Sequence, residues 1–254
     1  MSLQLLERDG WVVVPDAVPV ERVDALRVAM DRAHELQRPI QIRNGVGEGM
    51  EGTVHHLLAH EGEFLRLVEE MPCVPVLEGF LKSPVIINTF GGSTLRRGYR
   101  PYVANIHRDV RSFSRETRVM VQMLVMIDDF TLENGATHVL TGSHLHPERP
   151  ADEEFFQRAD RAVGRAGSVL LFDSQAWHAA GANTTDAPRR CLTLTFTRPA
   201  VKQQMDYPRL VGWDRVAAMS TQVQQLVGYL SRTPSTLDEW YQPPERRFYR
   251  RGQG

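Results

Sequence analysis

The sequence predicts a mainly β protein, a sandwich or barrel of short strands with flanking α-helices. From residue 85 onward, short runs rich in β-branched residues alternate with Gly and Asn turns, which is typical of strands joined by tight connections. Before residue 85, apolar residues recur every three to four positions, which indicates helices. A chain of 254 residues without an internal repeat has an ordinary length for one barrel. We therefore expect a single domain over residues 1–254.

The N-terminal part is predicted to contain one strand and two helices. Residues 9–15, Asp-Gly-Trp-Val-Val-Val-Pro, form a short apolar run between turn residues and predict a strand. A long helix is expected after Pro19, where the apolar positions have helical spacing: Val23, Leu26, Met30, Ala33 and Leu36. Residues 64–70 predict a second helix. Helix formation beyond it is expected to be interrupted by three prolines, Pro72, Pro75 and Pro84.

A glycine-rich loop between these two helices is a candidate lid over a binding site. Glycines stand at positions 45, 47, 49 and 52, and a segment this rich in glycine loses much backbone entropy on ordering. His55 and His56 close the loop. Adjacent residues of a strand face opposite ways, so one of the two rings at most serves a given site. Packing or solvent exposure is the expected role of both, and a substrate contact is the alternative.

The C-terminal part is predicted to supply most strands. They are expected at residues 85–90, 102–109, 119–127, 137–140, 168–172 and 191–197. Surface helices are expected at residues 152–163 and 214–230. The Arg-rich tail from Pro243 is expected to be loosely ordered.

Composition argues against several classes of protein. A formal net charge of −1 does not suit a generic nucleic-acid binder or a polybasic membrane-surface protein. The longest apolar runs are too short to span a membrane, and the N-terminus shows no secretory signal. Cys73 and Cys191 are too few for a disulfide framework, which fits a reducing cytosol. We expect a cytoplasmic protein whose partner is a small-molecule substrate, with no nucleic acid and no membrane; the sequence indicates no oligomeric state.

The stretch Asn-Ile-His-Arg-Asp at residues 105–109 predicts two ligands of a metal ion. In an extended segment, His107 and Asp109 point to the same face, while Arg108 points away. The best candidate for a third ligand is His178, a short distance after the apolar run 168–172. Two His and one carboxylate on one face of a metal are typical of non-haem Fe(II) oxygenases. A lone His-x-Asp is more typical of a surface loop, so the prediction depends on all three residues.

Alternation along residues 189–197 places Arg189 on a polar strand face. Arg189 shares this face with Cys191, Thr193 and Thr195, whereas Arg190 lies on the apolar face that is expected to pack against the scaffold. A buried guanidinium needs a carboxylate or phosphate partner, supplied by the protein or by a ligand. By the same reasoning, Gln122 is the single polar residue on its strand face and is expected to form a hydrogen bond with a ligand or with the backbone.

Several short segments stand in a fixed order along the chain: Asp9-Gly10-Trp11, His107-Arg108-Asp109, Glu133-Asn134-Gly135-Ala136-Thr137, Gly142-Ser143-His144, and Trp177-His178 followed by Asn183 and Arg189. In matching order, from about residue 5 to about residue 200, they resemble the phytanoyl-CoA dioxygenase-like family of Fe(II)/2-oxoglutarate oxygenases. The resemblance implies a double-stranded β-helix, a jelly-roll or cupin-like barrel. It also implies that His107, Asp109 and His178 are the catalytic iron ligands, and that Arg189 binds the distal carboxylate of 2-oxoglutarate.

The activity implied by this resemblance uses Fe(II), the cosubstrate 2-oxoglutarate and O2. The family oxidises fatty acyl thioesters, compatible solutes and natural products, so we expect oxidation of a C–H bond in a small organic substrate, most simply hydroxylation, with release of succinate and CO2. Halogenating relatives carry a small residue in place of the carboxylate ligand, so the presence of Asp109 disfavours halogenation. Asn105, Gln122 and Thr137 are expected to contact 2-oxoglutarate or substrate, with a structural role as the alternative.

Two other functions fit the same three residues. A zinc-dependent hydrolase or isomerase would use them with an activated water, but it would give Arg189 no function. A non-catalytic ligand-binding barrel would not require the intact ligand set. Consumption of 2-oxoglutarate with formation of succinate distinguishes an oxygenase from both.

Overall fold

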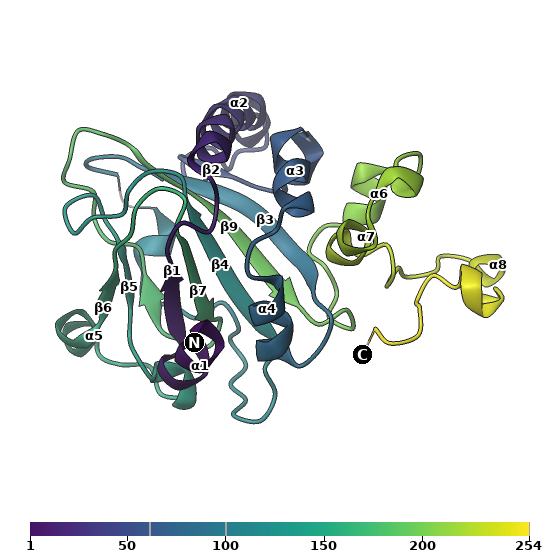
Figure 1. Ribbon diagram of the computed structural model, residues 1–254. Coiled ribbons are helices and arrows are strands. Elements are labelled where there is room, and N and C mark those ends of the chain that lie inside the picture. The colour runs from purple at the N-terminus through teal and green to yellow at the C-terminus, as the bar shows by residue number, and fades with distance from the viewer. Residues whose placement is uncertain (61, 100, 254) are drawn as a thin grey trace.

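The structure is a computed structural model that describes residues 1–60, 62–99 and 101–253 (Figure 1). It contains two β-sheets in which every neighbouring pair of strands is antiparallel. The larger sheet holds, in spatial order, β1 (Trp11–Val14), β7 (Val169–Asp173), β4 (Met120–Met126), β9 (Arg189–Thr197), β3 (Ile86–Leu95) and β2 (Thr53–Val54). The smaller sheet holds β6 (Asp160–Ala162), β5 (Thr137–Val139) and β8 (His178–Ala179).

Helices cover one face of the larger sheet and both ends of the molecule. Those that contribute side chains to the core on this face are α1 (Ser2–Asp9), α2 (Val20–Arg43), α3 (Glu63–Glu69), α4 (Val74–Leu81), α6 (Tyr207–Val211) and α7 (Thr221–Val227). In Figure 1, α5 (Asp152–Arg158) lies beside β5 and β6, whereas α6 (Tyr207–Val211) and α8 (Leu237–Trp240) lie at the opposite end. None of the helices in the described ranges is both long and apolar enough to cross a membrane.

The prediction of a mainly β protein is wrong, because helices hold more of the described residues than strands do. Helix α2 alone runs for 24 residues and continues through Pro39. Helix α1 was not expected, and α4 forms where prolines were expected to prevent a helix. Pro75 stands in the first turn of α4, where the missing N–H group has no intrahelical acceptor in any case.

The larger sheet separates two apolar clusters. On the helical side, Leu192, Leu194 and Phe196 of β9 pack with Leu26 and Met30 of α2. On the opposite face, a second cluster joins the two sheets and includes Leu124, Leu170, Phe172, Val139 and Ala162. Alternate residues of the central strands therefore face a helical layer or the space between the sheets.

The strands predicted at 85–90, 119–127, 137–140, 168–172 and 191–197 are confirmed as β3, β4, β5, β7 and β9, with shifted ends. The strand predicted at 102–109 is wrong: a 3-10 helix, η2 (Tyr102–Ala104), follows Pro101, and His107 forms only an isolated bridge with His178. The helix predicted at 152–163 ends at Arg158, because the next residues join β5 as strand β6. The helix predicted at 214–230 is divided into a 3-10 turn, η4 (Val216–Ala218), and α7, because the Ser220 side chain caps the N-terminus of α7.

Thr197 provides a test of packing on β9. Its side chain is fully buried, and its hydroxyl has no hydrogen-bond partner in the part of the chain that the structure describes. Burial of an unsatisfied hydroxyl costs free energy, and valine has nearly the same shape. Thr197→Val is therefore expected to raise the free energy of unfolding by about 1 kcal/mol, as measured by urea denaturation. A decrease would show that the hydroxyl has a partner in solution.

Candidate functional site

The backbone brings His107 and His178 together from distant parts of the chain. The His107 amide donates to the His178 carbonyl over 3.0 Å, and the His178 amide donates back over 3.1 Å. Two residues further on, the amide of Asp109 donates to the Ser174 carbonyl over 3.0 Å. The segment 105–109 is thus held in place by backbone hydrogen bonds to the segment 174–178, although it is not a strand.

The orientation of both imidazole rings is fixed in the same way. Nδ1 of His107 lies 2.7 Å from the carbonyl oxygen of Asn105, and Nδ1 of His178 lies 3.0 Å from that of Ala176. A carbonyl oxygen only accepts, so Nδ1 carries the proton in each ring and the Nε2 lone pair stays available. Metal-ligating histidines are typically held by such a bond from the other ring nitrogen.

The two Nε2 atoms and the Asp109 carboxylate converge on one point. Asp109 Oδ1 lies 3.7 Å from His107 Nε2 and 3.8 Å from His178 Nε2, and the three residues offer ligand atoms within 4.8 Å of one another. The second carboxylate oxygen, Oδ2, is buried without a hydrogen-bond partner among the described residues. A donor set of two imidazoles and one carboxylate, with one oxygen otherwise unsatisfied, fits a divalent metal such as Fe(II).

Arg108 stabilises this segment from behind. Its guanidinium donates to the carbonyl oxygens of Ser143, His146 and Pro147 and stacks on the Trp177 ring, 4.4 Å from its centroid. The Arg108 side chain therefore points away from the His107 ring and the Asp109 carboxylate, as the alternation of side chains in an extended segment predicted. Its bonds tie the segment to the loop after β5.

Burial lowers the pKa of both His178 and His138 to about 4. Unfolded histidine has a pKa of about 6.5, so below that pH the unfolded chain gains protons that the folded chain does not. The free energy of unfolding of the metal-free protein is thus expected to fall from pH 6.5 toward pH 4, by about 3 kcal/mol per ring. Urea denaturation at several pH values measures this loss. His138→Phe, outside the candidate metal site, should reduce it, and an unchanged pH profile in this variant would contradict the assignment.

A cavity of about 630 Å³ opens beside the three residues, between the two sheets. It is lined by every residue that the sequence singled out: His107, Asp109, His178, Arg189, Asn105, Gln122 and Thr137. Gln122 Oε1 is buried without a partner in the described ranges, and Thr137 is buried on β5. Asn105 is exposed at the cavity. These positions allow contact with a bound molecule.

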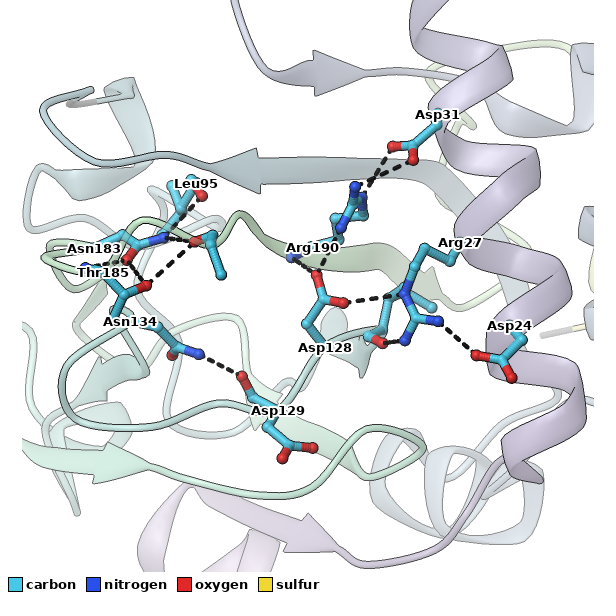
Figure 2. A network of polar contacts seen from close by, with 12 residues as sticks. Asp24, Arg27, Asp31, Leu95, Asp128, Asp129, Asn134, Asn183, Thr185 and Arg190 are labelled. Carbon is cyan, nitrogen blue, oxygen red and sulfur yellow. Dashed lines mark hydrogen bonds and ion pairs between the residues drawn. The ribbon is translucent and has the colours of Figure 1, made fainter.

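Arg189 and Arg190 have opposite environments. Arg190 is paired with Asp31 of α2 and with Asp128, which also binds Arg27, so its charge is neutralised on the helical side of the sheet (Figure 2). Arg189 is only 2% exposed, faces the cavity, and forms no ion pair with a carboxylate of the described chain. Its Nε and Nη1 atoms lack partners there, and its guanidinium stacks on Phe130, 4.0 Å from the ring centroid. Such a buried cation fits the carboxylate of a ligand such as 2-oxoglutarate.

Asn183 and Asp186 are not among the described residues that line the cavity. The Asn183 amide donates to the carbonyl oxygens of Leu95 and Ala187, which fastens the loop before β9 to the end of β3 (Figure 2). Asp186, the acidic residue nearest to Arg189 in sequence, instead pairs with Arg97 over 2.7 Å.

Sequence reasoning missed part of the cavity wall. Tyr102 lines it and Phe130 supports Arg189, and neither was expected there. Arg111 lines it as well, as do His55 and His56, for which a substrate contact was the alternative to packing or solvent exposure. The expectation that one histidine at most faces a given site is wrong, because His56 is not in a strand: it adopts a left-handed backbone conformation with φ of 51°. No local pattern around residue 55 signals this turn.

Comparison with known proteins gives a family for the chain. The family model described as phytanoyl-CoA dioxygenase (PhyH) matches residues 6–191. An uncharacterized protein of Mycobacterium tuberculosis is 32% identical over 96% of this chain and 92% of its own length. The dioxygenase cdmA of Talaromyces verruculosus is 25% identical over 90% of this chain and 82% of its own.

Solved structures share the fold. The non-heme alpha ketoglutarate dependent epimerase SnoN from nogalamycin biosynthesis is similar with a TM-score of 0.58 and 20% identity, over 77% of this chain and 79% of that one. The carbocyclase SnoK from the same biosynthesis gives a TM-score of 0.60 at 17% identity, over 77% and 82%. The mixed sheet-and-helix fold thus resembles that of these two enzymes. Since the family model spans most of the sequence, this chain belongs to the phytanoyl-CoA dioxygenase family, whose members use Fe(II), 2-oxoglutarate and O2.

Proposed function

We propose that the protein is an Fe(II)- and 2-oxoglutarate-dependent dioxygenase that oxidises, most simply hydroxylates, a C–H bond of a small organic substrate. The observation that carries this proposal is the buried, unpaired guanidinium of Arg189 in the same cavity as His107, Asp109 and His178. A metal site alone would fit many reactions. A metal site with a buried cation beside it fits a cosubstrate that binds the metal through one end and carries a carboxylate at its other end.

Each residue has a distinct role in this proposal. His107, Asp109 and His178 would hold Fe(II) through Nε2, a carboxylate oxygen and Nε2. When bound, Fe(II) and 2-oxoglutarate supply the oxidising chemistry, in which the cosubstrate is converted to succinate and CO2. Arg189 binds the distal carboxylate and so fixes the direction of 2-oxoglutarate in the cavity. Gln122, Thr137 and Asn105 hydrogen-bond to the cosubstrate or the substrate.

The fold that we propose is a double-stranded β-helix formed as a single domain by residues 1–254. Support comes from the two facing antiparallel sheets, with the candidate site in the cavity between them. The names of relatives support a small organic substrate: several are called dioxygenases, and SnoN and SnoK act in nogalamycin biosynthesis.

Succinate release tests the proposal. Purified protein with Fe(II), 2-oxoglutarate and O2 is expected to form succinate, slowly without substrate and faster when a library contains one. Omitting O2 should stop the reaction. Turnover of a library compound that needs neither O2 nor 2-oxoglutarate would instead favour a metal-dependent hydrolase or isomerase.

A further inference from the structure

His55 and His56, which directly follow β2, form one wall of the cavity, and their backbone is held firmly in place. The side chain of Gln37, from α2, binds the backbone of His55 on both sides: its Oε1 accepts from the His55 amide over 2.9 Å, and its Nε2 donates to the His55 carbonyl over 2.6 Å. Gly91 of β3 permits the close approach, because a Cβ there would lie 2.6 Å from the carbonyl oxygen of Val54. The backbone is thus fixed without any use of the His55 ring.

Both rings remain available to a ligand. His55 and His56 line the cavity, and the His56 ring is oriented by a 3.1 Å hydrogen bond between its Nδ1 and the hydroxyl of the buried Tyr207, which leaves Nε2 available. Burial lowers the pKa of both histidines. At neutral pH each ring is therefore uncharged. The His55 ring offers one donor and one acceptor, as a hydroxyl group requires, and the His56 ring offers its Nε2.

A row of hydroxyl groups continues this wall along the sheet. Thr193 and Thr195 of β9 face the cavity, and Thr89 of β3, which pairs with Thr195 in register, hydrogen-bonds to its hydroxyl. Gly91 pairs with Thr193 and lies beside the His55 backbone, so Thr193 is one strand away from the imidazole wall. These side chains add neutral donors and acceptors.

Most charged side chains that line the cavity already have another partner or an assigned role. Asp109 is the one carboxylate among the lining residues of the described chain, and it belongs to the candidate metal site. Of the guanidinium groups on the wall, Arg108 binds backbone carbonyls and Arg189 faces the cosubstrate position, which leaves the exposed Arg111. A cationic substrate would lack a counterion, and an anionic group would find a cation only at an exposed side chain.

We propose that the substrate is neutral and carries several hydroxyl groups, as a glycosyl ring does, and that His55 and Thr193 recognise these hydroxyls. This inference rests on the proposed oxygenase function and defines its substrate class. The two side chains act on substrate binding only, since neither belongs to the candidate metal centre nor lies beside Arg189 in the strand. Their loss should therefore change recognition while the basal reaction continues.

The test compares two rates in the Fe(II)-loaded protein: succinate release with 2-oxoglutarate alone, and its stimulation by added probes. The neutral probes are methyl hexopyranosides and a cyclitol; the contrasting probes are a fatty acyl coenzyme A thioester and glycine betaine. We expect stimulation by at least one neutral probe and by neither contrasting probe. His55→Phe and Thr193→Val should each raise the KM for that probe by about tenfold, the loss of one hydrogen bond, with the basal rate unchanged.

Matched variants separate recognition from folding. His34→Phe, on α2, is the control for His55→Phe. Thr197→Val, on the same strand as Thr193 but beyond the cavity, is the control for Thr193→Val. Neither control should alter the KM. Stimulation by the acyl thioester or betaine and by no neutral probe would overturn the substrate class. An unchanged KM in both cavity variants would overturn the assignment of His55 and Thr193. Absence of basal succinate release from the wild-type protein would refute the oxygenase proposal itself, and this inference with it.

Discussion

Arg189→Met is expected to weaken 2-oxoglutarate binding by at least roughly a hundredfold, because it leaves the distal carboxylate of the cosubstrate without its cation. Breaking a buried ion pair by removal of one partner costs about 3–5 kcal/mol, and each 1.4 kcal/mol is a factor of ten in Kd. Methionine retains most of the apolar length that packs beside Phe130, so the cavity should keep its shape. Titration of 2-oxoglutarate into the Fe(II)-loaded, oxygen-free protein measures the effect.

The neighbouring residue supplies a matched control. Arg190→Met removes a charge from the same strand, but it breaks the ion pairs with Asp31 and Asp128 and leaves the cavity untouched. It is expected to lower the free energy of unfolding by about 1–3 kcal/mol with no change in 2-oxoglutarate affinity. Arg189→Met should weaken 2-oxoglutarate binding without lowering the free energy of unfolding, since the cosubstrate-free protein loses an unpaired buried cation. Equal affinities in the two variants would mean that Arg189 does not bind the cosubstrate.

Asp109→Ala is expected to abolish stable Fe(II) binding and, with it, succinate formation. Loss of groups that merely orient metal ligands costs about 10–100-fold in affinity or activity, so loss of a ligand should exceed a hundredfold. The metal-free variant should remain folded, because the wild-type Asp109 carboxylate has an unsatisfied buried oxygen within the described structure. The measurement is the increase in melting temperature on adding Fe(II), which should disappear.

Asp186→Ala provides the comparison for this variant. Asp186 is an exposed carboxylate whose partner is Arg97, and its loss should leave the metal-induced shift intact. An Asp109→Ala protein that still forms succinate at the wild-type rate would refute the assignment of this ligand.

The spacing of chemical groups along the chain allowed the candidate site to be predicted. A His and an Asp two residues apart converge when the backbone is locally extended, even though residues 105–109 do not form a strand. Alternation distinguished Arg189 from Arg190 for a similar reason, because β9 is a central strand between β4 and β3 and its two faces have different neighbours. The pairing of His107 with Asp109 and the choice of Arg189 required only the direction of side chains within one short segment, whereas His178 had to be added from a separate segment.

Features that depend on distant contacts were not predictable. The His55 segment is positioned by Gln37, 18 residues earlier, and by close packing against Gly91, and neither contact leaves a local pattern. Residues 160–162 look helical by spacing but pair with β5. Part of the excess of helix over strand arose in the same way: α1 and α4 are short helices that pack against each other and the sheet, so tertiary contacts stabilise them more than sequence propensity does.

The central claim is that one cavity binds Fe(II) through His107, Asp109 and His178 and 2-oxoglutarate through Arg189. The most direct measurement is the visible charge-transfer absorption that develops when 2-oxoglutarate is added to the Fe(II)-loaded protein without oxygen. In the wild-type protein, we predict a band whose intensity saturates at one 2-oxoglutarate per chain. We predict no band in Asp109→Ala, and a band in Arg189→Met only at much higher 2-oxoglutarate concentration. A wild-type protein that shows no band, or three proteins with the same titration curve, would contradict the account.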